Sequence, residues 1–142
     1  MSKLRTIPAW KKADKTDRWT EILFRALTSR VAKRWRFVSF RGTGGGEWRG
    51  IVDVLAIRKN TSPPKDHLLK AGDVFDVVVV QMKGGKARMP RPSEVERLRA
   101  VARRYRAKDI VLFEWTKGQR CRFSRWRGGN WRPVKSAAEV FG

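Results

Sequence analysis

The chain has 142 residues, 41% of them hydrophobic, which is enough for one domain with its own core. Its 34 Lys and Arg outnumber 13 Asp and Glu, for a formal charge of +21, and a surface this self-repelling favours a polyanion, most often nucleic acid, as partner. One cysteine and one histidine, Cys121 and His67, exclude an intramolecular disulfide, a multi-cysteine zinc site and a histidine-based metal cage. We expect a single domain over residues 1–142 that contacts nucleic acid. A basic ribosome-associated or architectural protein without chemistry fits the composition too.

The amino-terminal region divides into a basic arm and a helix. Residues 1–15 are charged and include Pro8, which predicts a flexible basic arm. No apolar run there is long enough for a signal peptide or a membrane span, so we expect a cytoplasmic, nucleoid-associated protein without membrane contact. From residue 16 the pattern predicts a helix to about residue 33 or 34, with Thr16 or Asp17 as its cap. The apolar stripe of this helix consists of Trp19, Ile22, Leu23, Ala26, Leu27 and Val31.

Three strands are predicted next. Residues 36–41 alternate in polarity, and the glycine tract 42–46 after them predicts a loop that a phosphate backbone could approach, or a simple connector. The tract lacks the GKS or GKT ending of a P-loop, so ATP binding is not expected. Residues 51–58 form the second strand, and 60–72 a polar excursion before the third, 74–83. The apolar run 77–80 does not alternate, as expected of a central strand covered on both faces.

The second half of the chain predicts a helix and two more strands. After a basic loop at 86–91, Pro92 and a capping-box pattern at Ser93–Glu96 begin a helix. Its buried stripe is Val95, Leu98, Ala102 and Tyr105, and its other face carries Arg99, Arg103 and Arg106. Residues 109–115 and 120–126 form strands, 127–130 a turn and 136–141 a short terminal helix. The order α-β-β-β-α-β-β predicts an α/β fold, a central mixed sheet flanked by helices.

Polar residues interrupt two of these strands. Asp53 lies inside the second strand, and Gln81 and Lys83 end the third at a spacing of two, so these two side chains leave the strand on one face. A carboxylate, an amide oxygen and an ammonium could hold a hard cation and a water beside a phosphate. Chance polar interruption of the strands is the alternative, although burying such groups without function is costly. Asp76 has the opposite parity and is expected to be structural.

The order of these motifs resembles the PD-(D/E)xK nuclease superfamily. The resemblance spans residues 16–126 and lies in a first helix with Glu21, RGTGGG at 41–46, GIVDVLA at 50–56 and VQMKG at 80–84. Within the superfamily, the chain is most similar to archaeal-type Holliday junction resolvases and to the catalytic domains of Mrr-type restriction endonucleases. This likeness implies a restriction-endonuclease-like fold. It also implies hydrolysis of DNA phosphodiester bonds with Mg²⁺, for which Mn²⁺ substitutes.

The resemblance assigns roles to individual residues. Asp53 matches the metal-binding Asp of the family and Lys83 its Lys, while Gln81 stands where the family usually has Glu or Asp. The backbone carbonyl of Met82 could complete the metal shell. Val52 replaces the usual Pro, and Gln81 removes one negative charge, as in the Q-x-K version of Mrr-type enzymes. A further carboxylate is then needed to bind the metal, and Glu21 is the first candidate, with Asp17 and Glu47 as alternatives.

DNA contacts are expected from basic residues and from glycines that allow close approach. The residues concerned are Arg41, Gly44, Gly45, Lys86, Arg88, Arg91, Arg99 and Arg103, together with a loop at 125–132. Trp126 and Trp131 are expected either to stack on unpaired bases or to pack. A resolvase needs two active sites, so a homodimer is expected if the substrate is a junction. The alternatives to an endonuclease are a nuclease-like DNA-binding protein without cleavage and a basic RNA-binding protein.

Overall fold

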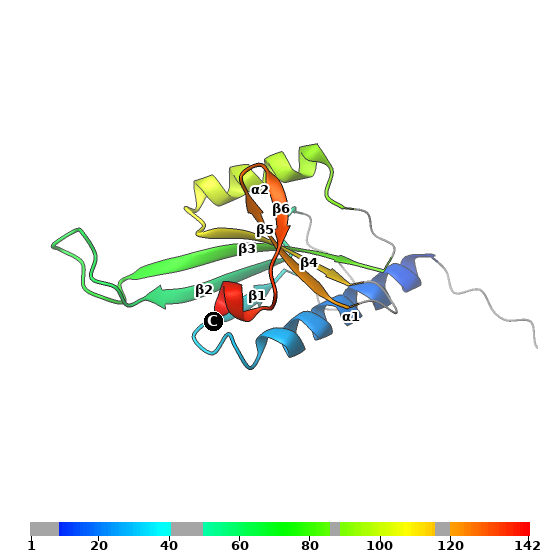
Figure 1. Ribbon diagram of the computed structural model, residues 1–142, viewed down its shortest axis with the longest axis horizontal. Coiled ribbons are helices and arrows are strands. Elements are labelled where there is room, and N and C mark those ends of the chain that lie inside the picture. Colours follow the sequence, from blue (N-terminus) through cyan, green and yellow to red (C-terminus); the bar gives the residue numbers. More distant parts are fainter. Residues whose placement is uncertain (1–8, 41–49, 86–88, 116–119) are drawn as a thin grey trace, which may run out of the picture.

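The computed structural model describes residues 9–40, 50–85, 89–115 and 120–142, with side chains from residue 18 onward. A six-stranded sheet lies between helices on its two faces (Figure 1). In chain order the elements are α1 (Ala9–Thr28), β1 (Arg36–Ser39), β2 (Val54–Asn60), β3 (Val74–Gly84), α2 (Pro92–Arg104), β4 (Asp109–Trp115), β5 (Arg122–Arg127), β6 (Asn130–Pro133) and α3 (Ala138–Phe141). Among the helices within these ranges, none is long and apolar enough to cross a membrane.

The strands lie side by side in the order in which they occur in the chain. Every neighbouring pair is antiparallel except β3 and β4, which are parallel and are joined by α2. A parallel pair requires such a crossover, because the chain must return to the same end of the sheet. Val78, Val79 and Val80 at the centre of β3 are at most 1% exposed, which confirms the prediction of a central strand. The predicted mixed sheet flanked by helices is also confirmed.

Helix α1 covers one face of the sheet through an aromatic cluster. Phe24 is fully buried and its ring centroid lies 5.3 Å from that of Phe37, 5.5 Å from Phe113 and 6.2 Å from Phe141. Phe113 is the register partner of Met82, so α1 packs on the face that carries the even-numbered residues of β3. Edge-to-face contacts of this kind add to the free energy gained by burial.

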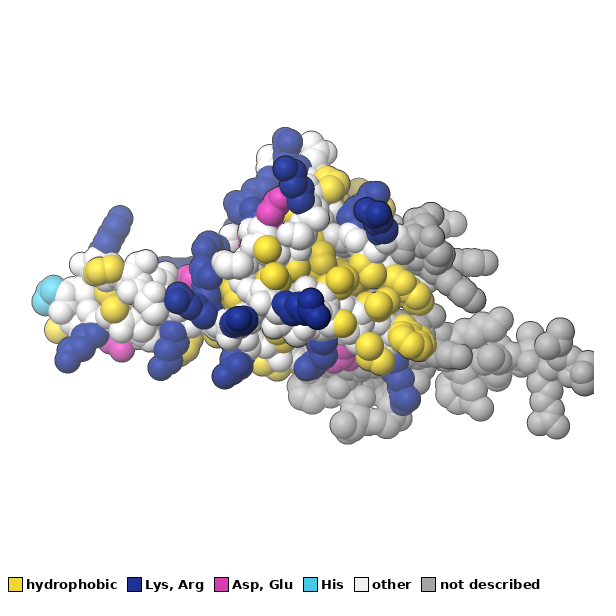
Figure 2. Space-filling model, turned by 60° about the horizontal axis from the view of Figure 1, so that its bottom comes forward, with side chains coloured by type: hydrophobic (Ala, Val, Ile, Leu, Met, Phe, Trp, Pro, Cys, Tyr) yellow, Lys and Arg dark blue, Asp and Glu magenta, His cyan; other side chains and the backbone are white. Residues whose placement is uncertain are grey.

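The predicted apolar stripe of α1 is wrong in part. Thr20, Phe24 and Thr28 form the fully buried column at a spacing of four, and the Thr28 hydroxyl donates to the Phe24 carbonyl at 2.9 Å. This local bond satisfies the hydroxyl and allows a polar residue to enter the core. In contrast, Trp19 is 48% exposed and Ile22 54%. Figure 2, turned so that the side bearing α1 comes forward, shows apolar side chains at the surface of this face.

The limits of α1 also differ from the prediction. Residues 9–15 are already helical, so the predicted arm is wrong over these residues, and Thr16 and Asp17 lie inside the helix rather than at its cap. The sequence there is rich in Lys and Ala, which are good helix formers. Residues 1–8 lie outside the described part of the chain. The helix ends at Thr28, before the predicted residue 33, because the chain turns to bury Trp35, which is 3% exposed.

The buried stripe of α2 is confirmed except at its end. Val95, Leu98 and Ala102 are buried as predicted, whereas Tyr105 is 61% exposed because the helix ends one residue before it.

The predicted loop at 125–132 is a β-hairpin instead. Strands β5 and β6 are joined by Gly128 at φ 58° and Gly129 at φ 80°, and two successive positive φ angles match a tight hairpin turn. Strand β6 was not predicted, because four residues ending in proline give too short an alternation. Helix α3 confirms the predicted terminal helix.

Candidate functional site

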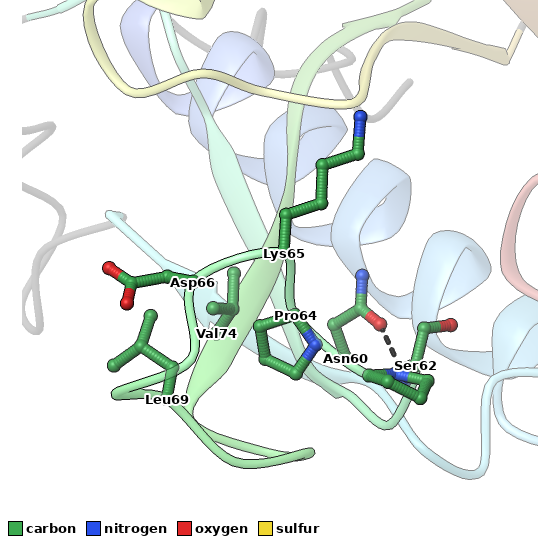
Figure 3. A pocket seen from close by; sticks show the side chains of 8 residues that line it. Asn60, Ser62, Pro64, Lys65, Asp66, Leu69 and Val74 are labelled. Carbon is green, nitrogen blue, oxygen red and sulfur yellow. Dashed lines mark hydrogen bonds between the residues drawn. The ribbon is translucent and has the colours of Figure 1, made fainter.

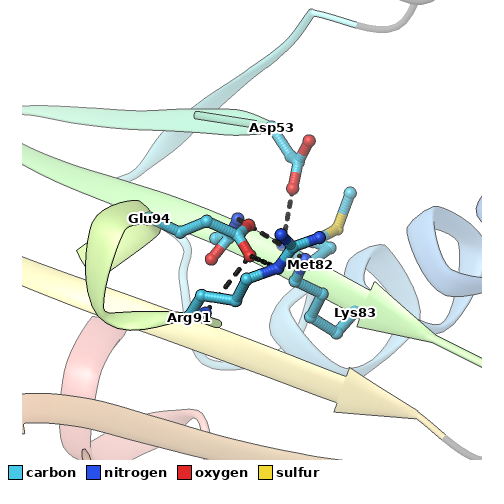
Figure 4. A network of polar contacts seen from close by, with 6 residues as sticks. Asp53, Met82, Lys83, Arg91 and Glu94 are labelled. Atoms are coloured by element: carbon cyan, nitrogen blue, oxygen red, sulfur yellow. Dashed lines mark hydrogen bonds and ion pairs between the residues drawn. The ribbon is translucent and has the colours of Figure 1, made fainter. Parts of the chain in front are cut away.

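The sheet forks where β2 begins. The ladder between β2 and β3 starts at the pair Val54 and Val80, whereas β3 continues to Gly84 along β4 alone. Beyond Val80, no described strand pairs with the edge of β3 that faces β2, and we call this place, between Asp53 and Met82, the fork. Asp53 lies at the fork: its backbone N–H donates to the Val80 carbonyl at 2.9 Å, and its carboxylate accepts the backbone N–H of Met82 at 2.7 Å (Figure 4).

Gln81 and Lys83 leave β3 on one face, as their spacing predicted. This face is opposite α1, and both side chains meet Glu94 of α2. The Gln81 side-chain amide donates to Glu94 Oε2 at 3.3 Å, and Lys83 Nζ lies 3.2 Å from the same oxygen. Gln81 is 4% exposed, while the Lys83 and Glu94 side chains are about a quarter exposed. The structure thus adds a carboxylate that sequence reasoning missed.

The beginning of α2 explains the position of Glu94. Arg91 is the N-cap residue and Pro92 occupies the first helical position, which makes Glu94 the third. Glu94 Oε1 accepts the backbone N–H of Arg91 at 3.2 Å. This bond is the main reason that the pKa of Glu94 is lowered, and the contacts with Lys83 and Gln81 lower it further while burial opposes them. Glu94 is therefore an ionised carboxylate at the positive end of a helix dipole.

A closer use of the proline signal could have found Glu94. The capping pattern at Ser93–Glu96 located the helix but set its first residue two positions late. Pro is favoured at the first helical position, so Pro92 would have made Glu94 the third. The docking of that carboxylate on β3 is a tertiary contact, which no local pattern reveals.

The amide of Gln81 presents an unpaired oxygen. Its nitrogen is held by Glu94, whereas Gln81 Oε1 is buried and has no hydrogen-bond partner among the described residues. A buried acceptor left unpaired costs about 1–3 kcal/mol, and a bound cation would remove this cost. The N–H and C=O of a strand residue face the same edge, so the Met82 carbonyl faces the fork as well. Carboxylate, amide and backbone oxygens form a donor set that suits Mg²⁺.

Of the additional acidic ligands that were predicted, the one whose side chain the structure describes, Glu21, does not lie with Gln81 and Lys83. Glu21 pairs with Arg25 at 3.2 Å on α1, which packs on the other face of the sheet. The side chain of Asp17 and all of Glu47 lie outside the described residues. Glu114 of β4 is the register partner of Lys83, so both leave the sheet on one face. Within the described ranges no three His, Cys, Asp or Glu residues group as a metal site.

Comparison with known proteins finds no family model and no curated protein that matches the chain. A solved structure of Archaeoglobus fulgidus Hjc, a Holliday junction resolvase from an archaeal hyperthermophile, matches with a TM-score of 0.50 and 14% identity, over 88% of this chain and 99% of that one. The fold is restriction-endonuclease-like. At this identity the match shows the fold alone.

Only some of the residues predicted to contact DNA lie in the described part of the chain. Arg91, Arg99 and Arg103 are exposed on and beside α2, with Arg99 paired to Glu96 at 3.1 Å. Arg41, Gly44, Gly45, Lys86 and Arg88 lie outside the described residues. On the face in Figure 2, Lys and Arg side chains are widespread and Asp and Glu side chains few. The charge of the sequence is therefore visible on the surface.

Features at the other end of the strands are structural. Asp76, on the face opposite Gln81 as predicted, accepts from Arg58 at 2.9 Å and from Asn60 at 3.1 Å. The excursion after β2 encloses a hollow of about 290 Å³ lined by residues such as Pro64 and Lys65 (Figure 3). The hollow and the fork lie at opposite ends of β2, a strand of seven residues that is about 20 Å long.

Proposed function

We propose that the protein is a metal-dependent DNA endonuclease whose active site is the fork between β2 and β3. The observation that carries the proposal is the buried Gln81 Oε1, which has no hydrogen-bond partner among the described residues and belongs to the residue before Met82, whose N–H binds the Asp53 carboxylate. The restriction-endonuclease-like fold supports it, as does the charge of +21, which suits a polyanionic substrate. Mg²⁺ is the proposed cofactor and Mn²⁺ its substitute.

Each residue of the fork has a separate proposed role in the reaction. Asp53, the Gln81 carbonyl and the Met82 carbonyl would hold the metal. When bound, the metal polarises a phosphoryl oxygen and lowers the pKa of a bound water. Lys83 orients the attacking water or offsets negative charge that develops at phosphorus. Glu94 accepts from Lys83 and Gln81 and so fixes both side chains.

The substrate proposed is branched DNA, because the matching structure is that of a Holliday junction resolvase. Cutting two strands of a junction needs two active sites, and a symmetric dimer supplies them. Trp19 and Ile22 on α1 provide exposed apolar surface that a dimer contact could cover. The Q-x-K spacing of Gln81 and Lys83 supports a proposed relation to Mrr-type enzymes. Glu21 remains a proposed helper of the site.

A DNA-binding protein without cleavage is the second candidate. It is favoured by the neutral Gln81 at a position that needs a metal ligand, and by the lack of an acidic cluster in the described ranges. Lys83, held by Glu94, would then contribute only positive charge to a DNA surface.

Cleavage of supercoiled, linear and four-way-junction DNA with Mg²⁺ or Mn²⁺ tests the proposal. Asp53→Asn and Lys83→Ala should each lower the rate by at least about 100-fold, since each removes a group that acts on charge in the transition state. Lys59→Ala is the control, because it removes an equal charge from the exposed end of β2. Metal-dependent cleavage that survives both substitutions would refute the site. DNA binding with no cleavage of any substrate would establish the second candidate.

A further inference from the structure

Two shallow pockets flank Trp126 on the face of the sheet that carries α2. One, of about 260 Å³, lies between Trp126 and the second half of α2, where Arg103 and Arg106 line it. The other, of about 240 Å³, lies between Trp126, Trp131 and Pro92 at the start of α2. Because Trp126 lines both, the pockets form one surface that follows α2 along its length. We call it the α2–hairpin surface.

The two tryptophans form an aromatic wall. Trp126 and Trp131 are opposite each other on β5 and β6, with ring centroids 5.2 Å apart and planes at 73°. Both are half-buried, so their rings are already ordered while part of their surface is open. Trp131 Nε1 is buried and has no hydrogen-bond partner among the described residues. An ordered, partly open aromatic pair is suited to stack on nucleic-acid bases.

The arginines of this surface are available to an anion. Arg103 and Arg106 are exposed and form no ion pair with any described residue. In contrast, Arg125 and Arg127, which flank Trp126 on β5, both pair with Asp109, at 3.4 Å and 3.1 Å. The two arginines of this surface that form no ion pair with a described residue therefore lie on the α2 side of Trp126, where a phosphate could reach them.

Arg106 occupies a position where glycine would suit the backbone better. It follows the C-cap residue Tyr105 and has φ 50°, in the left-handed region. Helices commonly end with glycine in this conformation, because a side chain there is strained. An arginine at this position costs stability, and its side chain lines the pocket beside Trp126. This position therefore carries a positive charge on a strained backbone.

We propose that the α2–hairpin surface binds an unpaired strand of DNA, with bases against Trp126 and Trp131 and phosphates on Arg103 and Arg106. An unpaired strand fits because its base faces are open, whereas those in a duplex are covered by neighbouring pairs. DNA as the ligand rests on the proposed function. Pro92 lines one end of the surface and lies two residues from Glu94, so the strand leads toward the fork. The substrate is then DNA that carries a single-stranded segment.

Binding of oligonucleotides to the full chain without metal tests this proposal. The probes are a thymidine 12-mer, its RNA counterpart and a 12-base-pair duplex, followed by fluorescence anisotropy and by quenching of tryptophan emission. Trp126→Ala should weaken binding of the single strand by about 5- to 100-fold, the value of one stacked base, and duplex binding much less. Arg103→Ala should weaken it too, and Arg104→Ala, at the neighbouring exposed position outside the pockets, should not.

Arg106→Gly keeps the test valid if Trp126→Ala fails to fold. It should raise the midpoint of thermal unfolding by relieving the strained backbone and yet weaken binding of the single strand. Single-strand binding that stays at wild-type strength in Trp126→Ala and Arg106→Gly would overturn the proposal. Equal losses for single strand and duplex, or tighter binding of the RNA probe, would overturn it too. Because no metal is present, a protein that binds through Trp126 but cuts no DNA would refute only the proposed endonuclease.

Discussion

Replacing Glu94 with Gln tests how the fork is held together. Glu94 Oε2 accepts from Gln81 and lies 3.2 Å from Lys83 Nζ, and its other oxygen accepts the backbone N–H of Arg91. At 3.2 Å the charge pair alone would be worth about 5 kcal/mol at an effective dielectric of 20. Both side chains are about a quarter exposed, so desolvation and screening reduce the net contribution to folding to about 1 kcal/mol.

The larger expected effect of Glu94→Gln is on the site. A glutamine has one acceptor oxygen in place of two, so it cannot accept from both the Arg91 backbone and the Gln81 amide, and the Gln81 carbonyl loses its fixed orientation. Loss of a group that orients a metal ligand typically costs about 10- to 100-fold in metal affinity or activity. Mn²⁺ titration without DNA and cleavage rates across Mg²⁺ concentrations measure the two effects. Glu96→Gln is the matched control, because Glu96 is exposed and pairs with Arg99.

Wild-type metal affinity and cleavage rate in Glu94→Gln would refute the positioning role of Glu94. A fall in the free energy of unfolding alone would show that Glu94 only caps α2. The Mn²⁺ titration separates these outcomes, because a loss of helix stability of about 1 kcal/mol leaves nearly all of a typical domain folded.

Two further predictions concern stability. Because the pKa of Glu94 is lowered in the folded protein, its ionised form stabilises the fold. This stability is fully present above the ordinary pKa of a glutamate and is lost as the pH falls through the lowered pKa. In urea unfolding, the difference in stability between wild type and Glu94→Gln should therefore be present at pH 7 and vanish at strongly acid pH. Phe24→Ala should cost about 3–5 kcal/mol, because it opens a cavity in the core, whereas Leu27→Ala at a residue that is 44% exposed should cost less than about 1 kcal/mol; equal losses in urea unfolding would contradict the observed orientation of α1.

The central strands were predictable because their signals are local. Uninterrupted Val residues indicated a covered strand, and the spacing of Gln81 and Lys83 placed both side chains on one face. The buried face of α1 was not predictable in this way. Its apolar residues outnumber the positions that the sheet can cover, and Thr28 enters the core through a bond to Phe24 that a hydrophobic pattern does not register.

Contacts between elements were the part of the site that the sequence did not reveal. Glu94 is 11 residues from Lys83 in the sequence and meets it only when α2 docks on the sheet. The edge position of Asp53 depends on where the β2 ladder begins. Strand β6 brings Trp131 beside Trp126 through a two-glycine turn. Each of these requires the tertiary arrangement, because propensity and alternation describe one element at a time.

The neutral Gln81 and the carboxylate of Glu94 are best understood as a pair. The Gln81 amide nitrogen is 3.3 Å from Glu94 Oε2, a contact that a Glu at position 81 would turn into repulsion between two carboxylates. The carboxylate that contacts Lys83 is thus supplied by α2. Gln81→Glu alone should therefore reduce metal-dependent cleavage and stability, and adding Glu94→Gln should restore both. Additive losses in the double variant would show that the two residues act independently.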